Sequence, residues 1–183
     1  CVDDGVLTYD CAVFPPAATS PYVLPWSIGT THRAFPHAAK DNPTLDDKYS
    51  VEVLMPIGTG ILAMRDGVVA LVEESFVDGD NAPRHENYVL LEHEDGTVAP
   101  YVHLTYGGAV FSVADRVRQG EIIAYSGHTG SSTEPHLHVD LTNAVTDNQT
   151  LPLNFRNATT VPPLKPDLSC GLRYGVLYTA EPY

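Results

Sequence analysis

Two histidines one residue apart, His136 and His138, form the pattern in this chain with the clearest chemical use. Side chains on a β-strand alternate between its two faces, so both imidazoles are expected on the same side. Such a pair can share the work of a metal site: one ring binds the ion and the other handles a proton or a negatively charged oxygen. A His-x-His pair alone is weak evidence. Here Gly127, Gly130 and Pro135 predict a tight turn that leads into the strand, which strengthens the interpretation.

Three other places offer residues for the same site. His103 ends an apolar run, where strand alternation predicts that it faces the same side as Tyr101. Glu52 stands within the apolar run 50–55, and a carboxylate there is costly unless it is paired or ligated. A loop further upstream holds His32, His37 and Asp41. Each has an ordinary alternative, because Glu52 can face solvent on an edge strand and single histidines are more often surface or core residues.

The segments that must position these residues predict an all-β fold. Short runs rich in Val, Ile, Leu and Tyr alternate with glycine turns, and no window of 12 or more residues carries a helical stripe. The runs cover residues 50–55, 60–64, 68–73, 87–92, 98–104, 113–117, 121–126 and 136–141. Asp66-Gly67 and Asp95-Gly96 are turn signatures between them. This spacing indicates an antiparallel β-sandwich or a barrel-like fold.

The chain divides into a central β domain and two loop-rich ends. Residues 1–48 are predicted to be an N-terminal arm and loop packed on the domain, with a proline-rich part to residue 30 and a long loop over 31–49. Residues 49–142 form the β domain. Residues 143–183 are predicted to be a C-terminal loop and clasp, with a final strand or clasp at 172–178.

The three cysteines, Cys1, Cys11 and Cys170, lie only near the two ends of the chain. None belongs to a CxxC motif, so a cysteine zinc cluster is not expected. Their positions suggest a disulfide that ties the two ends together in an oxidising compartment. With Cys1 as the acylated first residue of a lipoprotein, Cys11 and Cys170 form the bridge. This hypothesis includes a lipid tether through Cys1.

Composition and charge exclude several functions. A hydrophobic content of 43% is ordinary for a globular protein, and no apolar run approaches the roughly 18 residues needed for a transmembrane helix. The formal net charge of −13 argues against a nucleic-acid partner, since phosphates are bound by Lys and Arg. It also argues against an anionic membrane surface.

The order of the motifs resembles the lysostaphin-like (LytM-type) zinc metallopeptidases over about residues 49–141. The motifs that carry the resemblance are Pro56-Ile57-Gly58-Thr59, Asp66-Gly67-Val68-Val69, Asn87-Tyr88-Val89, Tyr101-Val102-His103-Leu104, Ser126-Gly127-His128-Thr129-Gly130 and His136-Leu137-His138. The resemblance implies the duplicated hybrid motif fold and one zinc ion. It also implies hydrolysis of peptide bonds in bacterial cell-wall peptidoglycan, by an extracellular or periplasmic enzyme.

The same resemblance implies a role for each site residue. In the family, the zinc ligands are a histidine, an aspartate and the second histidine of His-x-His, which corresponds to His138 here. The aspartate position, four residues before Pro56, holds Glu52. The commonest histidine position holds Lys48, which cannot serve, so His37 is the first candidate for a displaced ligand. His32 is the second candidate for the histidine ligand, after His37. Asp41 is the second candidate for the carboxylate ligand, after Glu52.

The remaining site residues follow from the same pattern. His103 and His136 correspond to the catalytic pair, one accepting a proton and the other stabilising the oxyanion. Tyr101 either donates a further hydrogen bond to the oxyanion or packs in the core. Glu134 stands where the family usually has glycine, at the rim of the substrate cleft.

Two functions from different classes are open at this point. The first is a secreted zinc endopeptidase that acts on peptidoglycan or similar short peptides. The second is a degenerate module that keeps the fold and binds peptide, peptidoglycan or a protein partner without hydrolysis. The three downstream histidines favour the enzyme, whereas the altered upstream ligand positions favour the module.

Overall fold

The computed structural model describes residues 11–37, 47–146, 149–161 and 168–183. Within these residues the predicted all-β fold is confirmed, and the paired strands run antiparallel. The helical elements named in this part are two short 3-10 turns, η1 (Cys11–Val13) and η2 (Ala17–Thr19). No helix in the described ranges has the length and apolar character needed to cross a bilayer.

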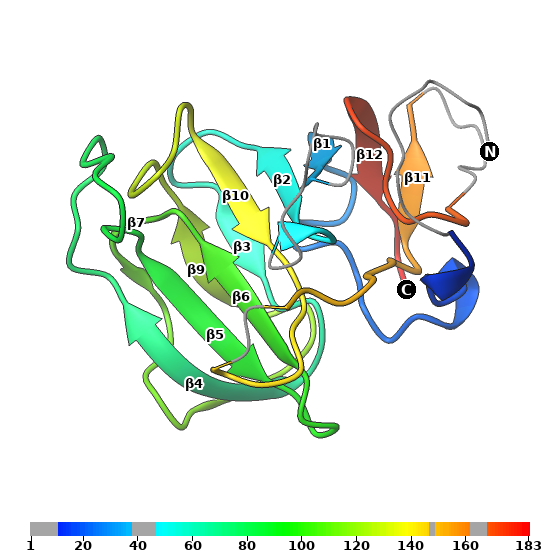
Figure 1. Cartoon of the computed structure of the whole chain (residues 1–183), viewed down its shortest axis with the longest axis horizontal. Helices are drawn as coiled ribbons and strands as arrows, with labels where there is room; N and C mark the ends of the chain where they lie inside the picture. Colours follow the sequence, from blue (N-terminus) through cyan, green and yellow to red (C-terminus); the bar gives the residue numbers. More distant parts are fainter. Residues whose placement is uncertain (1–10, 38–46, 147–148, 162–167) are drawn as a thin grey trace.

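Nine strands form the larger sheet, in the order β11-β12-β1-β2-β10-β6-β5-β4-β8 (Figure 1). In chain order they are β1 (Thr31–Pro36), β2 (Val51–Leu54), β4 (Gly67–Glu73), β5 (Tyr88–Glu92), β6 (Val98–Val102), β8 (Arg116–Val117), β10 (His136–Val139), β11 (Ala158–Thr160) and β12 (Val176–Ala180). A smaller sheet has the order β3-β9-β7, with β3 at Gly60–Leu62, β9 at Ile122–Ser126 and β7 at Leu104–Ala109. Because β11 and β8 lie at the edges of the larger sheet, the fold is not a closed barrel.

A single apolar core joins the two sheets. Val53 of β2 and Leu137 of β10 belong to the same buried cluster as Ile61 of β3 and Ile123 of β9. The alternation of β10 places Leu137 and Val139 in this cluster. The two histidines of β10 therefore lie on the opposite face of the strand, which is where the chemistry of this protein is expected.

The ends of the chain contribute to the sheet and to the core. The prediction of a loop over 31–49 is wrong for residues 31–36, which form β1. The prediction of a C-terminal loop from residue 143 is wrong for residues 158–160, which form β11. Neither segment has the Val- and Ile-rich pattern of a central strand, so each is recognisable only through its partners. Trp26 and Phe155, from opposite ends, are both buried in the main core.

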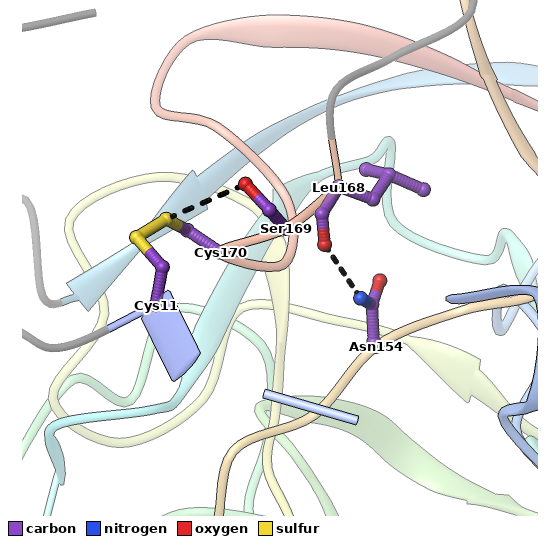
Figure 2. The surroundings of a disulfide bond; sticks show 5 residues. All are labelled: Cys11, Asn154, Leu168, Ser169 and Cys170. Carbon is purple, nitrogen blue, oxygen red and sulfur yellow. Dashed lines mark hydrogen bonds between the residues drawn. A yellow bond between two sulfur atoms is a disulfide. The ribbon is translucent and has the colours of Figure 1, made fainter. Parts of the chain in front are cut away.

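The predicted bridge between Cys11 and Cys170 is present in the structure, with the two Cα atoms 4.5 Å apart (Figure 2). It joins residues 159 positions apart in the sequence. Next to it, Asn154 Nδ2 donates a 2.7 Å hydrogen bond to the carbonyl of Leu168. The disulfide therefore ties the η1 turn to the segment that precedes β12. Cys1, the predicted point of lipid attachment, lies outside the described residues.

Candidate metal centre and active site

The floor of the candidate site is formed by three adjacent strands, β1, β2 and β10. Across them, Phe35 pairs with Glu52, and Glu52 pairs with His138. Directly opposite residues in antiparallel strands project from the same face of a sheet. The pairing therefore brings the carboxylate of Glu52 and the imidazole of His138, which are 86 residues apart in the sequence, to one surface.

His37 continues this arrangement directly after β1. Its backbone N–H donates a 2.9 Å hydrogen bond to the carbonyl of Ser50, which extends the pairing of β1 with β2 by one residue. Its side chain lies between two carboxylates: Nδ1 contacts Asp47 Oδ2, and Nε2 lies 2.6 Å from Glu52 Oε1. Burial by itself lowers the pKa of His37, but the two carboxylates outweigh it and raise that pKa to about 9. The pocket strongly attracts positive charge.

Asp47 is the residue of this site that the sequence analysis missed. Oδ1 of Asp47 lies 3.7 Å from Nε2 of His138. Donor atoms of His37, Asp47 and His138 all lie within 4.8 Å of one another, an arrangement able to hold a metal ion. Nothing in the local sequence separates Asp47 from the other acidic residues of the loop, because its role depends on β1 folding back against β2.

The residues present fit a divalent cation. The donor atoms of His37, Asp47 and His138 converge, and Glu52 lies against Nε2 of His37; imidazole nitrogen and carboxylate oxygen are the donors that zinc accepts in catalytic sites. The carboxylate of Asp47 also faces Nδ1 of His37, the ring nitrogen opposite to the one that faces Glu52. A histidine that ligates through one nitrogen and donates its other N–H to a carboxylate is a common feature of metal sites.

His103 reaches the site through an unusual backbone conformation. Its φ of +63° lies in the left-handed region, and β6 ends at Val102 immediately before it. The strand alternation is therefore broken, and the ring of His103 lies 4.6 Å from that of His136. This corrects the prediction that His103 and Tyr101 share a face.

Tyr101 instead belongs to the apolar core. It is fully buried, and its hydroxyl accepts a 2.8 Å hydrogen bond from the backbone N–H of Met64. Tyr101 pairs with Val139, whose side chain is buried on the core face of β10. Packing is therefore the role that the structure indicates for it, not contact with a substrate.

The rings of His103 and His136 are held in the same way. Nδ1 of His103 donates to the carbonyl of Thr129 at 2.7 Å, and Nδ1 of His136 donates to the carbonyl of Glu134 at 2.7 Å. With a proton on Nδ1, a neutral imidazole offers the lone pair of Nε2. Burial and the neighbouring imidazoles of His136 and His138 lower the pKa of His103 to about 4, which keeps it neutral at pH 7.

The glycine-rich turn before β10 supplies the carbonyls that hold these rings. Gly130 has a φ of +67°, a conformation that favours glycine. At Gly127, a Cβ would lie 2.3 Å from the backbone N of Thr105, so only glycine permits this close approach to β7. These contacts place the carbonyl of Thr129 against His103.

The remaining predicted residues have different outcomes. His32 lies two positions before Ala34 on the core face of β1, where its ring packs 5.4 Å from that of Trp26, so the structure does not bring it to the site. Asp41 lies outside the described residues. Glu134 lines a cleft together with His136 and Glu52.

Comparison with known protein families matches residues 47–152 to Peptidase family M23. Among curated relatives, glycyl-glycine endopeptidase ALE-1 of Staphylococcus capitis is 36% identical over 102 residues, which are 55% of this chain and 26% of that protein. Peptidoglycan DD-endopeptidase ShyA of Vibrio cholerae is 36% identical over 87 residues, or 48% of this chain and 18% of that protein. The chain thus spans about a quarter or less of the length of these relatives.

A similar fold occurs in a solved structure described as a novel M23 metalloprotease, pseudoalterin, from deep-sea. It superposes with a TM-score of 0.51 at 17% identity and covers 77% of this chain and 81% of that one. At this level of identity the likeness concerns the fold alone.

Proposed function

Because the chain belongs to peptidase family M23, we propose that it is a zinc-dependent endopeptidase that hydrolyses peptide bonds of cell-wall peptidoglycan or similar short peptides. The observation that carries the proposal is the convergence of His37, Asp47 and His138 beside a second pair of histidines. The curated relatives ALE-1 and ShyA, named as a glycyl-glycine endopeptidase and a peptidoglycan DD-endopeptidase, support the substrate class.

His37, Glu52 and His138 are the proposed ligands. Glu52 lies within β2 and directly opposite His138, so its position is set by the strand pairing. Asp47 is proposed as the hydrogen-bond acceptor that orients His37 through Nδ1. A zinc ion in such a site acts as a Lewis acid that polarises a carbonyl group and makes water more acidic.

His103 and His136 are the proposed catalytic pair. Each ring offers Nε2 towards the shared space because Nδ1 is occupied by a backbone carbonyl. One ring accepts the proton that the attacking water loses as its oxygen bonds to the peptide carbon. The other, when protonated, donates to the carbonyl oxygen as that atom becomes negative. As the C–N bond breaks, the leaving nitrogen takes a proton from the pair.

The alternative of a degenerate binding module is not favoured by this geometry. Its main support was that the upstream ligand positions differ from the family pattern. In the structure, however, His37 and Glu52 lie against one another and beside His138. We also propose that the protein works outside the cytoplasm, because the bridge between Cys11 and Cys170 requires an oxidising compartment.

Metal content and turnover test the proposed function together. We expect the chain purified without chelator to hold close to one zinc per molecule and to cleave isolated peptidoglycan or its stem peptides. His138→Ala should abolish both zinc binding and cleavage. His136→Ala should retain zinc but lose about 10²- to 10⁴-fold in turnover, the usual contribution of a general acid or base. A chain that binds no added zinc would overturn the proposal.

A further inference from the structure

A cleft of about 320 Å³ lies directly beside the candidate metal centre. Glu52, Leu54 and His136 line it from β2 and β10, and the cross-strand pairing of Leu54 with His136 makes these residues neighbours on one surface. A peptide bond held by the catalytic pair would therefore have its neighbouring residues in this cleft. What it accepts depends on its two walls.

One wall is aromatic and comes from outside the region matched to the family. Phe35 of β1 and Tyr174, which precedes β12, both line the cleft, with their ring centroids 5.1 Å apart in an edge-to-face arrangement. Gly175 holds this wall in place by donating its N–H to the carbonyl of Ala34 at 2.8 Å. Tyr174 remains 54% exposed, so part of its ring is available to a ligand.

The other wall carries a carboxylate. Glu134 follows Ser131 and Thr133 along the rim, and its main-chain carbonyl is fixed by hydrogen bonds from Nδ1 of His136 and Oγ of Ser132. Within the described residues, its exposed side chain makes no hydrogen bond or ion pair. The described residues that line the cleft include no Lys or Arg. The cleft is therefore negatively charged, and Glu134 is the acidic residue that remains free when Glu52 binds the metal.

We propose that this cleft is a subsite for a positively charged amino group of the peptide substrate, bound by the carboxylate of Glu134 and the ring of Tyr174. A carboxylate forms charge-assisted hydrogen bonds with an ammonium group, and an aromatic face attracts the same cation. The amino group has two possible sources, a peptide N-terminus and a lysine-like side chain. This inference rests on the proposed function and adds the substrate chemistry that the site selects.

Binding of short peptides to the zinc-loaded full chain tests the subsite. The probes are tetraalanine amide with a free N-terminus, the same peptide N-acetylated, and N-acetylated peptides with lysine or ε-acetyl-lysine at each position in turn. We expect a free amine to improve the dissociation constant roughly tenfold, the sum of an exposed ion pair and a cation–π contact. Preference for the free N-terminus alone or for lysine alone identifies the source. Equal binding of free and acetylated peptides overturns the proposal.

Variants assign the preference to the two walls. Glu134→Gln should lower the ratio of free to acetylated binding about two- to threefold, and Tyr174→Ala should lower it about three- to fivefold, whereas Tyr174→Phe should keep it. Glu94→Gln removes the same charge from an exposed position in the turn between β5 and β6 and serves as the matched control. An unchanged ratio in Glu134→Gln would contradict the assignment.

The same experiment separates failure of the subsite from failure of the proposed function. Peptides that bind with a preference for free amines but are never cleaved would leave the subsite valid and contradict the endopeptidase proposal. Peptides that are cleaved without any such preference would contradict the subsite alone.

Discussion

Glu52 and His138 lie directly opposite each other on the neighbouring strands β2 and β10. Their spacing is therefore a property of the sheet register, and a slip of one residue would turn either side chain to the core face. On the other side, Glu52 Oε1 lies 2.6 Å from Nε2 of His37. Glu52 thus stands between the two histidines that we propose as ligands.

Replacing each carboxylate in turn distinguishes a ligand from an orienting residue. Glu52→Gln removes a proposed ligand, whereas Asp47→Asn removes the negative charge that faces Nδ1 of His37 and lies 3.7 Å from Nε2 of His138. We expect Asp47→Asn to weaken zinc binding roughly 10- to 100-fold and Glu52→Gln to weaken it more. Competition with a chromogenic chelator measures both affinities, with Glu94→Gln as the control. The reverse order would make Asp47 the ligand.

Asp140 is expected to support His138. It lies two residues further along the chain, with Oδ2 3.4 Å from Nε2 of His138 and 3.4 Å from Oγ of Ser50. Oδ1 is buried and has no hydrogen-bond partner in the described residues, which is costly for a carboxylate. We therefore expect Asp140→Asn to weaken zinc binding roughly tenfold, without lowering the free energy of unfolding of the metal-free protein.

Zinc titration and urea denaturation of the Asp140→Asn variant measure these two quantities. The ¹⁵N chemical shifts of the His138 ring report in addition whether its tautomer changes. Unchanged zinc affinity together with an unchanged tautomer would show that Asp140 does not orient His138.

The disulfide is expected to stabilise the whole fold. It closes a loop of 159 residues and packs with Phe14 and Tyr49 in a small cluster of its own. The double substitution Cys11→Ser and Cys170→Ser should lower the free energy of unfolding by about 2–5 kcal/mol, the usual cost of losing a native disulfide. Urea denaturation with and without reductant measures the effect. Reductant should destabilise the wild type and leave the double variant unchanged, and equal stability of both proteins would contradict the prediction.

His93 is expected to make stability depend on pH. It is buried, its Nδ1 donates to the carbonyl of Asp66 at 2.8 Å, and burial lowers its pKa in the folded state. As pH falls below about 6.5, the ordinary pKa of histidine, His93 becomes protonated in the unfolded chain while it is still neutral in the folded chain. The stabilisation from neutral His93 is therefore present at pH 7.5 and is lost progressively towards pH 5.5.

The variant His93→Gln isolates this contribution. Urea denaturation of both proteins at pH 7.5 and 5.5 should show a smaller loss of stability on acidification in the variant than in the wild type. An equal loss in both proteins would show that His93 does not carry the effect.

Much of the fold was recognisable from local patterns. The alternating runs before His138 and the Asp95-Gly96 turn predict β5, β6 and β10, because period-two alternation and turn chemistry act over a few neighbouring residues. β1 was not recognisable in this way. It lies between β2 and β12 and so obtains its hydrogen bonds from segments distant in the sequence.

For the site, the sequence by itself determined the residue types: His103, His136, His138 and Glu52 stand in motifs whose order and spacing identify a peptidase domain. Only the tertiary structure decided how these residues meet. The left-handed backbone at His103 turns its ring away from the face of Tyr101, and the return of β1 against β2 brings His37 and Asp47 to His138. The physical reason is that ligands must converge within a few ångströms, and this distance is set by strand pairing between segments far apart in the chain.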